Sequence, residues 1–535
     1  MADAARIAQE AEARLTPLGV AANLAWWNSQ VEATEENANR RARAELAWSD
    51  ALADRALYAS VEEARRNGAG GQVRRRLDLL HNLMLRRQVP DALRARIVEL
   101  ETSVDLRFSR HRGVVGGVEV GDTEIKRILR RSDDPRERRE AWEASKTVGA
   151  EVADDVRQLA RLRNEAALSL GHRDWFALSL ATDEVDEAKL VATLADCDRV
   201  TSEPFARWKA DLDERLAARF ACVVAELRPW HYSDPFFQEA PPAEVSLDPF
   251  YASLDLVALS ERYFAAVGFD VRDVIARSDL FERPAKCQHA FCMSMDRGDD
   301  VRVLCNLKPT ERWMGTMLHE LGHAVYDRHL ERSLPWLLRA QAHILTTEAS
   351  AMLFGRLSKS AAWLRTWAGA DARELERQAE PVARAVRQQL LVQTRWEMVM
   401  VHMERALYGD PEQDLRSLWW DLVERFQWVK RPEGRHAPDW AAKIHFSVAP
   451  VYYHNYQLGE MLASQLQDHL LRKVLGGGVD VWERYVRAPE VGTFLRREFY
   501  APGKRFDWRE LTRRATGRTL ESRPFVDELA GRSPA

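Results

Sequence analysis

The residues most able to do chemistry lie in one short segment, ERWMGTMLHELGHAVYDRHL, at positions 311–330. It contains the pattern HExxH, with His319 and His323 four residues apart and Glu320 directly after the first histidine. On a helix, residues four apart lie on one face, so both imidazoles can reach one ion. Two imidazoles and a carboxylate suit Zn²⁺ with one coordination position left open. Such an ion lowers the pKa of a bound water to about 7, and Glu320 can accept the water proton and pass it to a leaving amine.

A third ligand is expected on a neighbouring element. Glu348 lies in an apolar helical stretch, HILTTEASAMLFGRLS, where an unpaired buried carboxylate would be costly. We therefore predict Glu348 as the third ligand, with Thr346 or Thr347 as a helix cap. The alternatives are Asp327, His329 and His343, of which His343 is the strongest. Without a metal, the pattern would be an amphipathic helix with two incidental histidines.

The elements around this segment are mostly helical, because Ala, Leu, Arg and Glu dominate and apolar positions recur every three or four residues. The pattern predicts helices over 42–65 and 123–170, with Asp133, Asp134 and Pro135 as a helix start within the second. Gly and Pro clusters predict turns or loops at 68–71, 113–121, 228–249, 430–440 and 476–478. The strand-like runs 288–295 and 301–306 flank DRGDD, which predicts a β-hairpin just before the HExxH segment.

Composition excludes several classes of protein. The 535 residues include 78 basic and 82 acidic side chains, for a formal charge of −4, so a nucleic-acid binder is not expected. No run approaches 20 apolar residues and the first residues carry no secretory pattern, so neither a membrane span nor export is expected. Five cysteines are few and odd in number, which favours a reducing, cytoplasmic location.

The chain resembles the zinc metallopeptidases that combine HExxH with a downstream glutamate. Among them it is similar to the angiotensin-converting-enzyme type, family M2, and it shares features with the thimet-oligopeptidase type, family M3. The opening segment LAWWNSQVEATEENANR is similar to the N-terminal lid of the M2 type. Four further patches carry the resemblance: HELGHAVYD, Glu348 at 25 residues after His323, the pair His289-Ala290, and Lys443-Ile444-His445 followed by Tyr453 and Tyr456.

The resemblance implies a role for each of these residues. His289 and Ala290 lie in a strand to which an extended peptide can add by main-chain hydrogen bonds. His445 donates to a substrate carbonyl, and the Tyr456 hydroxyl stabilises the oxyanion of the tetrahedral intermediate. Two further residues, Lys443 and Tyr453, hold the C-terminal carboxylate of the substrate. Taken singly, the tyrosines could be core aromatics and the lysine a surface charge.

The sequence departs from the M2 pattern at several places. The spacing after His445 is one residue longer, so Tyr452 is an alternative to Tyr453. A glutamine that helps to bind the terminal carboxylate in the family has three candidates here, His231, Tyr232 and Gln238. The aspartate that orients a zinc-bound imidazole is replaced by Met352, and the chloride-binding arginine between the tyrosines by Asn455.

From these observations we predict a mainly α, two-lobed metallopeptidase with a deep central cleft and a small β-hairpin near the active site. Residues 1–535 form one unit, with a helical lid region over 1–110 and a catalytic core with one Zn²⁺ over 280–460. The expected reaction is the release of C-terminal dipeptides from short peptides by a monomer or weak homo-oligomer. The alternatives are an M3-type oligopeptidase or carboxypeptidase, a peptide-binding protein with a structural metal and no turnover, and a helical scaffold without metal.

Overall fold

The structure, a computed structural model, describes residues 2–241 and 245–532. Within these residues helices dominate, and the strands form two separate antiparallel pairs, β1–β2 and β3–β4. This arrangement confirms the predicted mainly α class. None of the described helices is both long and apolar enough to cross a membrane. The division into a lid region and a catalytic core stays a prediction.

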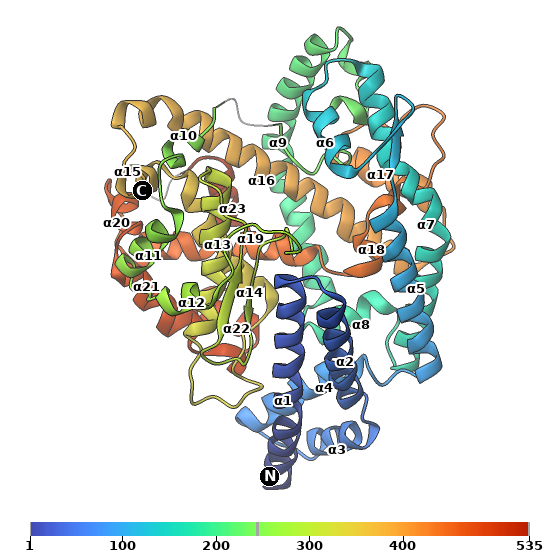
Figure 1. The fold of residues 1–535 in the computed structure, drawn as a ribbon, viewed down its shortest axis with the longest axis vertical. Helices are drawn as coiled ribbons and strands as arrows, with labels where there is room; N and C mark the ends of the chain where they lie inside the picture. Colours follow the sequence, from blue (N-terminus) through green and yellow to red (C-terminus); the bar gives the residue numbers. More distant parts are fainter. Residues whose placement is uncertain (1, 242–244, 533–535) are drawn as a thin grey trace.

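The N-terminal helices occupy the lower part of Figure 1. They are α1 (Ala2–Val31), α2 (Glu35–Leu52), α3 (Arg55–Arg66) and α4 (Gly71–Leu85). Their apolar faces form a small core of their own, which four residues from a later part of the chain join: Leu334, Trp336, Leu337 and Leu338. The predicted continuous helix over 42–65 is wrong, because the side chain of Asp54 accepts a hydrogen bond from Leu57 N–H and starts a new helix there.

The next part of the chain crosses to the other side of the molecule. It contains α5 (Asp91–Arg110), β1 (Gly113–Val115), β2 (Val118–Val120), α6 (Asp122–Arg131), α7 (Pro135–Ser169), α8 (Trp175–Thr182) and α9 (Glu187–Arg219). Asp134 caps α7 and Pro135 is its first residue, as the sequence predicts. The stretch from Gly113 to Gly121, expected as a turn, is a short hairpin. The predicted helix over 123–170 is two helices, with the break before Asp134.

The remaining helices build the main core around the site. They are α10 (Asp248–Tyr251), α11 (Leu256–Ala266), α12 (Arg272–Arg277), α15 (Ala361–Trp367), α16 (Ala372–Gly409), α17 (Leu415–Gln427), α18 (His445–Val448), α20 (Val481–Tyr485), α21 (Pro489–Phe494), α22 (Trp508–Thr516) and α23 (Arg523–Leu529). The long α16 runs across the upper half of Figure 1. Short 3₁₀ and π turns, such as Asp439–Ala442 in the predicted loop 430–440, connect several of them.

The predicted hairpin is present, with shorter strands than expected. The strand β3 (Phe291–Ser294) pairs antiparallel with β4 (Val301–Leu304), with Phe291 opposite Leu304. The DRGDD sequence forms the connecting turn, in which the Asp296 side chain accepts from Gly298 N–H at 2.7 Å. The Asn23 side chain of α1 donates to the backbone of β3 and the residue after it, so the N-terminal helices are fixed to the hairpin.

The HExxH segment lies in α13 (Glu311–Arg328), which packs closely on α14 (Ile344–Gly355), and α14 packs in turn on α19 (His454–His469). Two glycines permit the close approach. A Cβ at Gly322 of α13 would lie 2.8 Å from the Ala351 Cα of α14, and a Cβ at Gly459 of α19 would lie 3.2 Å from the Glu348 Cβ. The Ser350 hydroxyl also donates to the Gly322 carbonyl at 2.9 Å. These contacts set the spacing between the helices that carry the candidate ligands.

Replacing Gly322 by alanine is expected to lower the free energy of unfolding by about 1–3 kcal/mol, because the new methyl group meets backbone atoms that cannot move aside separately. Denaturant unfolding of the variant measures this difference. The matched control is Gly409→Ala at the end of α16, where an added Cβ meets nothing within 4 Å. A Gly322 variant as stable as this control would contradict the packing argument.

Candidate active site

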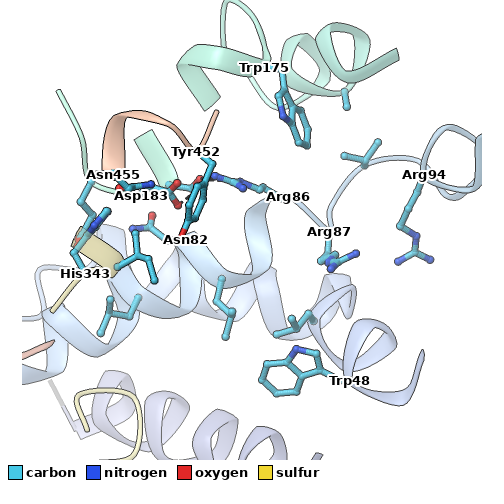
Figure 2. A pocket seen from close by; sticks show the side chains of 18 of the residues that line it. Trp48, Asn82, Arg86, Arg87, Arg94, Trp175, Asp183, His343, Tyr452 and Asn455 are labelled. Carbon is cyan, nitrogen blue, oxygen red and sulfur yellow. Dashed lines mark hydrogen bonds and ion pairs between the residues drawn. The ribbon is translucent and has the colours of Figure 1, made fainter. Parts of the chain in front are cut away.

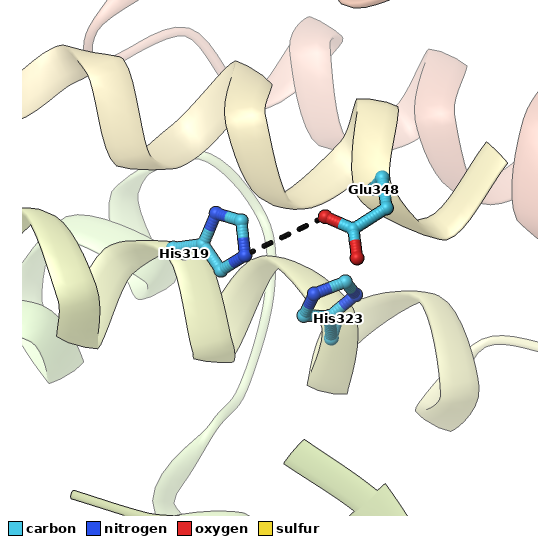
Figure 3. Close-up of side chains that lie close together, drawn as sticks. All are labelled: His319, His323 and Glu348. Atoms are coloured by element: carbon cyan, nitrogen blue, oxygen red, sulfur yellow. Dashed lines mark ion pairs between the residues drawn. The ribbon is translucent and has the colours of Figure 1, made fainter. Parts of the chain in front are cut away.

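The helix α13 presents both histidines to α14. Its start is fixed by Thr310, whose side chain accepts from Trp313 N–H. His319 and His323 then lie on one face with ring centroids 4.9 Å apart. Glu348 of α14 faces them, with a carboxylate oxygen 3.8 Å from His319 Nε2 (Figure 3). The nearest ligand atoms of the three side chains all lie within 4.8 Å of one another, a spacing that a single metal ion can bridge.

Thr347 holds the second histidine in place. Its buried hydroxyl lies 2.7 Å from His323 Nδ1. When Nδ1–H donates to this oxygen, the lone pair of Nε2 is left for a metal, which is the usual role of an outer hydrogen bond to a metal-binding histidine. Thr347 thus supplies an outer hydrogen bond to one of the two histidines, although Met352 offers none. The expectation that Thr346 or Thr347 caps α14 is confirmed in part: His343 is the N-cap residue and accepts from Leu345 N–H, and Thr346 completes the capping box by accepting from His343 N–H at 3.1 Å.

Replacing Thr347 by valine is expected to weaken zinc binding about 10–100-fold, because valine keeps the shape but removes the oxygen that orients His323. Competition with a chromogenic chelator measures the affinity. The adjacent Thr346→Val is a matched control: the Thr346 hydroxyl donates to the His343 carbonyl at the start of α14, so its loss should reduce stability and leave zinc affinity unchanged. Equal zinc affinity in both variants would show that Thr347 does not orient His323 for metal binding.

Glu320 points toward the hairpin side of the site. It is 7% exposed, and the backbone N–H of Cys292 in β3 donates to its carboxylate. Burial, followed by the charge of Glu348, raises the pKa of Glu320 to about 8 in the metal-free protein. The hairpin thus positions the predicted general base, a contact that the sequence analysis did not anticipate.

The donor set fits a divalent cation. Burial lowers the pKa of His319 to about 4 and that of His323 well below its usual value, so both are neutral ligands at pH 7. Burial raises the pKa of Glu348 to about 7, and His319 is the only basic side chain within ion-pair distance of it among the described residues. A cation between these three side chains would compensate the negative charges of Glu348 and the neighbouring Glu320 and would lower the pKa of each carboxyl group.

The site is open on one side. About 30% of the His319 side chain remains exposed, against 13% for Glu348. His319 and Glu320 line a cavity of about 410 Å³ together with residues of α16, among them Gln389 and Gln393. Structural zinc sites are closed by four protein ligands, whereas catalytic sites keep one position accessible. The exposed side of His319 therefore leaves space beside the three candidate ligands for a further group.

The rival ligands lie elsewhere. Asp327 is in α13 and binds the Gln341 side chain, and His329 is the cap residue that follows α13, with Nδ1 2.8 Å from the Val325 carbonyl. His343 is occupied as the cap of α14. Among the described residues, His319, His323 and Glu348 form the only group of three or more potential ligands with metal-binding spacing.

Lys443 lies in a polar and aromatic pocket. Its ammonium group donates to the Gln238 side chain at 2.8 Å and lies 5.0 Å from the Trp396 ring centroid and 5.9 Å from that of Tyr453. Burial lowers its pKa to about 8. The structure thus selects Gln238 among the three residues considered as partners in this pocket. His231 and Tyr232 are used elsewhere, His231 in a 3₁₀ turn and Tyr232 in hydrogen bonds to Asp213 and Lys209.

The other predicted substrate residues surround the start of α19. Tyr453 precedes the helix, its ring centroid 4.9 Å from that of His445 and 5.6 Å from that of Tyr456. Burial and the charge of Glu348 raise the pKa of Tyr456 to about 12, so its hydroxyl keeps its proton. Tyr452 stacks edge-on against Tyr456 at 5.2 Å. The His445 Nδ1 is buried without a hydrogen-bond partner in the described residues, and the contact of His445 with a substrate carbonyl stays a prediction.

His289 and Ala290 lie directly before β3 rather than within a strand, because pairing begins at Phe291. His289 is exposed. The predicted strand over 288–295 is therefore too long at its start, because the chain bends at Gln288 and His289 before it enters β3. Its proposed role in binding substrate main chain stays a prediction.

Comparison with known proteins places the chain among the peptidases. The model of Peptidase family M3 matches residues 128–531, about three quarters of the chain, and includes the whole candidate site. A second model, Angiotensin-converting enzyme, matches residues 1–196. A curated relative from Caenorhabditis elegans, "Inactive angiotensin-converting enzyme-related protein", is 21% identical over 316 residues, which are 56% of this chain and 34% of the relative. The chain thus spans about a third of the length of the curated relative that it matches.

These matches agree with the resemblance carried by the HExxH helix, the downstream glutamate and the Lys-x-His segment. The family model covers both helices that present the candidate ligands, α13 and α14, together with α19 and its tyrosines. The chain belongs to peptidase family M3, with an N-terminal part that is similar to angiotensin-converting enzyme.

Proposed function

We propose that this protein hydrolyses peptide bonds near the C-terminus of short peptides in a zinc-dependent reaction, with release of C-terminal dipeptides. One observation carries the proposal: a candidate ligand, His319, and the candidate general base, Glu320, line the same open cavity. The partly buried Lys443–Gln238 pair, which would take a terminal carboxylate, supports cleavage close to a free C-terminus. A cytoplasmic location remains part of the proposal.

His319, His323 and Glu348 would hold the zinc ion. When bound there, zinc would supply the Lewis acidity that polarises a carbonyl and activates water at neutral pH. Glu320 accepts a proton from the attacking water and transfers it to the nitrogen of the leaving amine. Thr347 keeps His323 in the required orientation throughout. The Tyr456 hydroxyl, which stays protonated, donates to the oxygen that becomes negative as the carbonyl is attacked.

Lys443 and Gln238 select the end of the substrate. An ammonium group in a poorly solvated pocket gains more from a carboxylate than an exposed one does, because water screens the pair less. The ring of Tyr453 covers one side of this pocket and also contacts His445, so carboxylate binding and the placement of the scissile carbonyl are linked through adjacent side chains. This arrangement favours dipeptide release over internal cleavage.

Replacing Lys443 by methionine is expected to raise KM about 10–100-fold for peptides with a free C-terminal carboxylate, since a hydrogen-bonded charge pair is lost, and to change kcat little. Peptides with an amidated C-terminus should be cleaved equally poorly by both proteins. Steady-state kinetics with matched acid and amide peptides measures this, and Lys308→Met at an exposed site is the control. An unchanged KM would show that Lys443 does not bind the C-terminal carboxylate of the substrate.

A second candidate function is peptide binding without turnover, because the curated relative carries the word "inactive" in its name. The two functions differ in one measurement. Mass spectrometry of products from a single decapeptide should show the loss of successive dipeptides if the protein is a peptidyl-dipeptidase, of single residues if it is a carboxypeptidase, and internal fragments if it is an oligopeptidase. Binding of zinc and peptide with no products of any kind would establish the binding protein.

A further inference from the structure

A second and larger cavity begins beside the candidate active site. It has a volume of about 860 Å³, within the range of ligand sites, and is lined by α4, α5 and the segment around Tyr452. Tyr452 connects it to the site, because its ring meets that of Tyr456 at 5.2 Å and the charge of Glu348 reaches its hydroxyl. Lys443 does not line this cavity. A substrate whose C-terminus lies at Lys443 would therefore place other residues, nearer its N-terminus, in the cavity.

The acidic groups that line the cavity are all neutralised by basic partners. Glu101 binds Arg163 at 2.6 Å, Asp183 binds Arg86 at 3.3 Å, and Glu184 binds Arg75 through two hydrogen bonds. Each partner already contributes the compensating charge, so these carboxylates offer no net attraction to a cationic peptide. The lining contains no further acidic side chain.

Two arginines of the lining, in contrast, have weaker partners. Arg87 makes no ion pair with any described residue, and Arg94 pairs only at 3.2 Å with the well-exposed Asp91, while its Nη1 is buried without a hydrogen-bond partner. Burial and then the charge of Arg94 lower the pKa of Arg87, and the charge of Glu101, which already binds Arg163, raises it. Lys504 makes no direct ion pair in the described residues either, but it lies near the charges of Asp183 and Glu184. Figure 2 shows Arg86 beside Tyr452, Arg87 farther along at a height between Trp175 and Trp48, and Arg94 beyond Arg87 at the right of the view.

We infer that this cavity binds acidic side chains of the substrate peptide, with Arg87 and Arg94 as the residues that confer the preference. Guanidinium groups with free N–H donors bind carboxylates in a two-pronged geometry, and the indole rings offer surface for the peptide around them. The inference rests on the proposed function, since it names the class of peptide that this function would take. It predicts selection for Asp or Glu outside the C-terminal dipeptide.

Binding can be tested without turnover. Zinc-loaded Glu320→Gln protein is titrated calorimetrically with decapeptides that carry Asp, Asn or Lys at the same two positions. This pair of positions is shifted stepwise from the N-terminus toward the C-terminus, and each placement is one register. At one register the Asp peptide should bind about tenfold more tightly than the neutral Asn peptide, because two partly exposed charge pairs form. The difference should shrink in 0.5 M salt, since screening weakens exposed pairs.

The double variant Arg87→Ala/Arg94→Ala should abolish this difference, and Arg87→Glu/Arg94→Glu should reverse it in favour of the Lys peptide. The matched control is Arg96→Ala/Arg110→Ala, which removes two exposed charges of α5 that do not line the cavity. Equal affinity for the Asp and Asn peptides at every register, or a preference that survives in the Arg87/Arg94 variant, would overturn the inference. Melting temperatures of all variants exclude misfolding as the cause.

The outcome separates the two proposals. If the wild-type protein cleaves peptides but shows no acidic preference, the proposed function stands and the inference about the cavity fails. If the acidic preference is present but the wild-type protein cleaves none of the peptides, the cavity assignment stands for a peptide-binding protein and the proposed hydrolysis fails.

Discussion

Replacing Glu320 by glutamine is expected to lower kcat by about 10²–10⁴-fold at saturating substrate, while the protein retains its zinc. The zinc should be retained because Glu320 is not one of the three candidate ligands His319, His323 and Glu348. The rate should fall because Glu320 lines the same cavity as His319 and is the predicted general base. Glutamine keeps the size of the side chain and can accept the Cys292 N–H, but it cannot take a proton from water at neutral pH. Hydrolysis of a quenched fluorescent peptide measures the rate, and elemental analysis measures the zinc.

Two controls make the Glu320 result specific. Glu320→Asp keeps the acid but withdraws it by one methylene, so it should retain partial activity. Glu376→Gln changes an exposed glutamate of α16 and should behave as wild type. If Glu320→Gln cleaves at the wild-type rate, the assigned general base is wrong.

Replacing Glu348 by glutamine is expected to weaken zinc binding by at least about 100-fold, because a charged ligand becomes a neutral amide. Activity should fall with the zinc content and recover in part when excess zinc is added. In the absence of zinc the variant should be as stable as the wild type or more stable, since the unpaired, partly buried carboxylate of Glu348 is costly when no cation is present. Chelator competition and thermal unfolding with and without zinc measure these effects.

Ligand binding stabilises a folded protein by an amount that grows with the logarithm of its affinity, so zinc should raise the melting temperature of the wild type more than that of the Glu348 variant. The control Glu376→Gln should show the full stabilisation. A Glu348→Gln protein that binds zinc as tightly as wild type would exclude Glu348 from the site and return His343 and Asp327 to consideration.

The sequence alone was sufficient for the part of the site that depends on local periodicity. His319 and His323 share a helix face because of their spacing, and Glu348 was singled out because an acid is unusual in an apolar helix. The hairpin was predicted from its turn sequence, though its first strand starts later, at Phe291. These signals are local, and tertiary packing did not alter them.

Other features depend on contacts between distant segments. Gln238 and Lys443 are 205 residues apart, and no local pattern links them. Thr347 was read as a cap because threonine favours that position, whereas its hydroxyl meets His323 across the helix interface. Its place directly before Glu348 in a buried helix was the available signal. The sequence does not reveal the helix break at Asp54, because aspartate also occurs on the exposed face of a continuous helix.

The central claim is that His319, His323 and Glu348, from two separate helices, hold one divalent cation. Crystals of the zinc-loaded wild-type protein, measured on both sides of the zinc absorption edge, test it most directly. The account predicts a single strong anomalous peak among the three side chains, within about 2.0–2.2 Å of two imidazole nitrogens and a carboxylate oxygen. No peak at this position, or a peak there with Glu348 turned away, would contradict it.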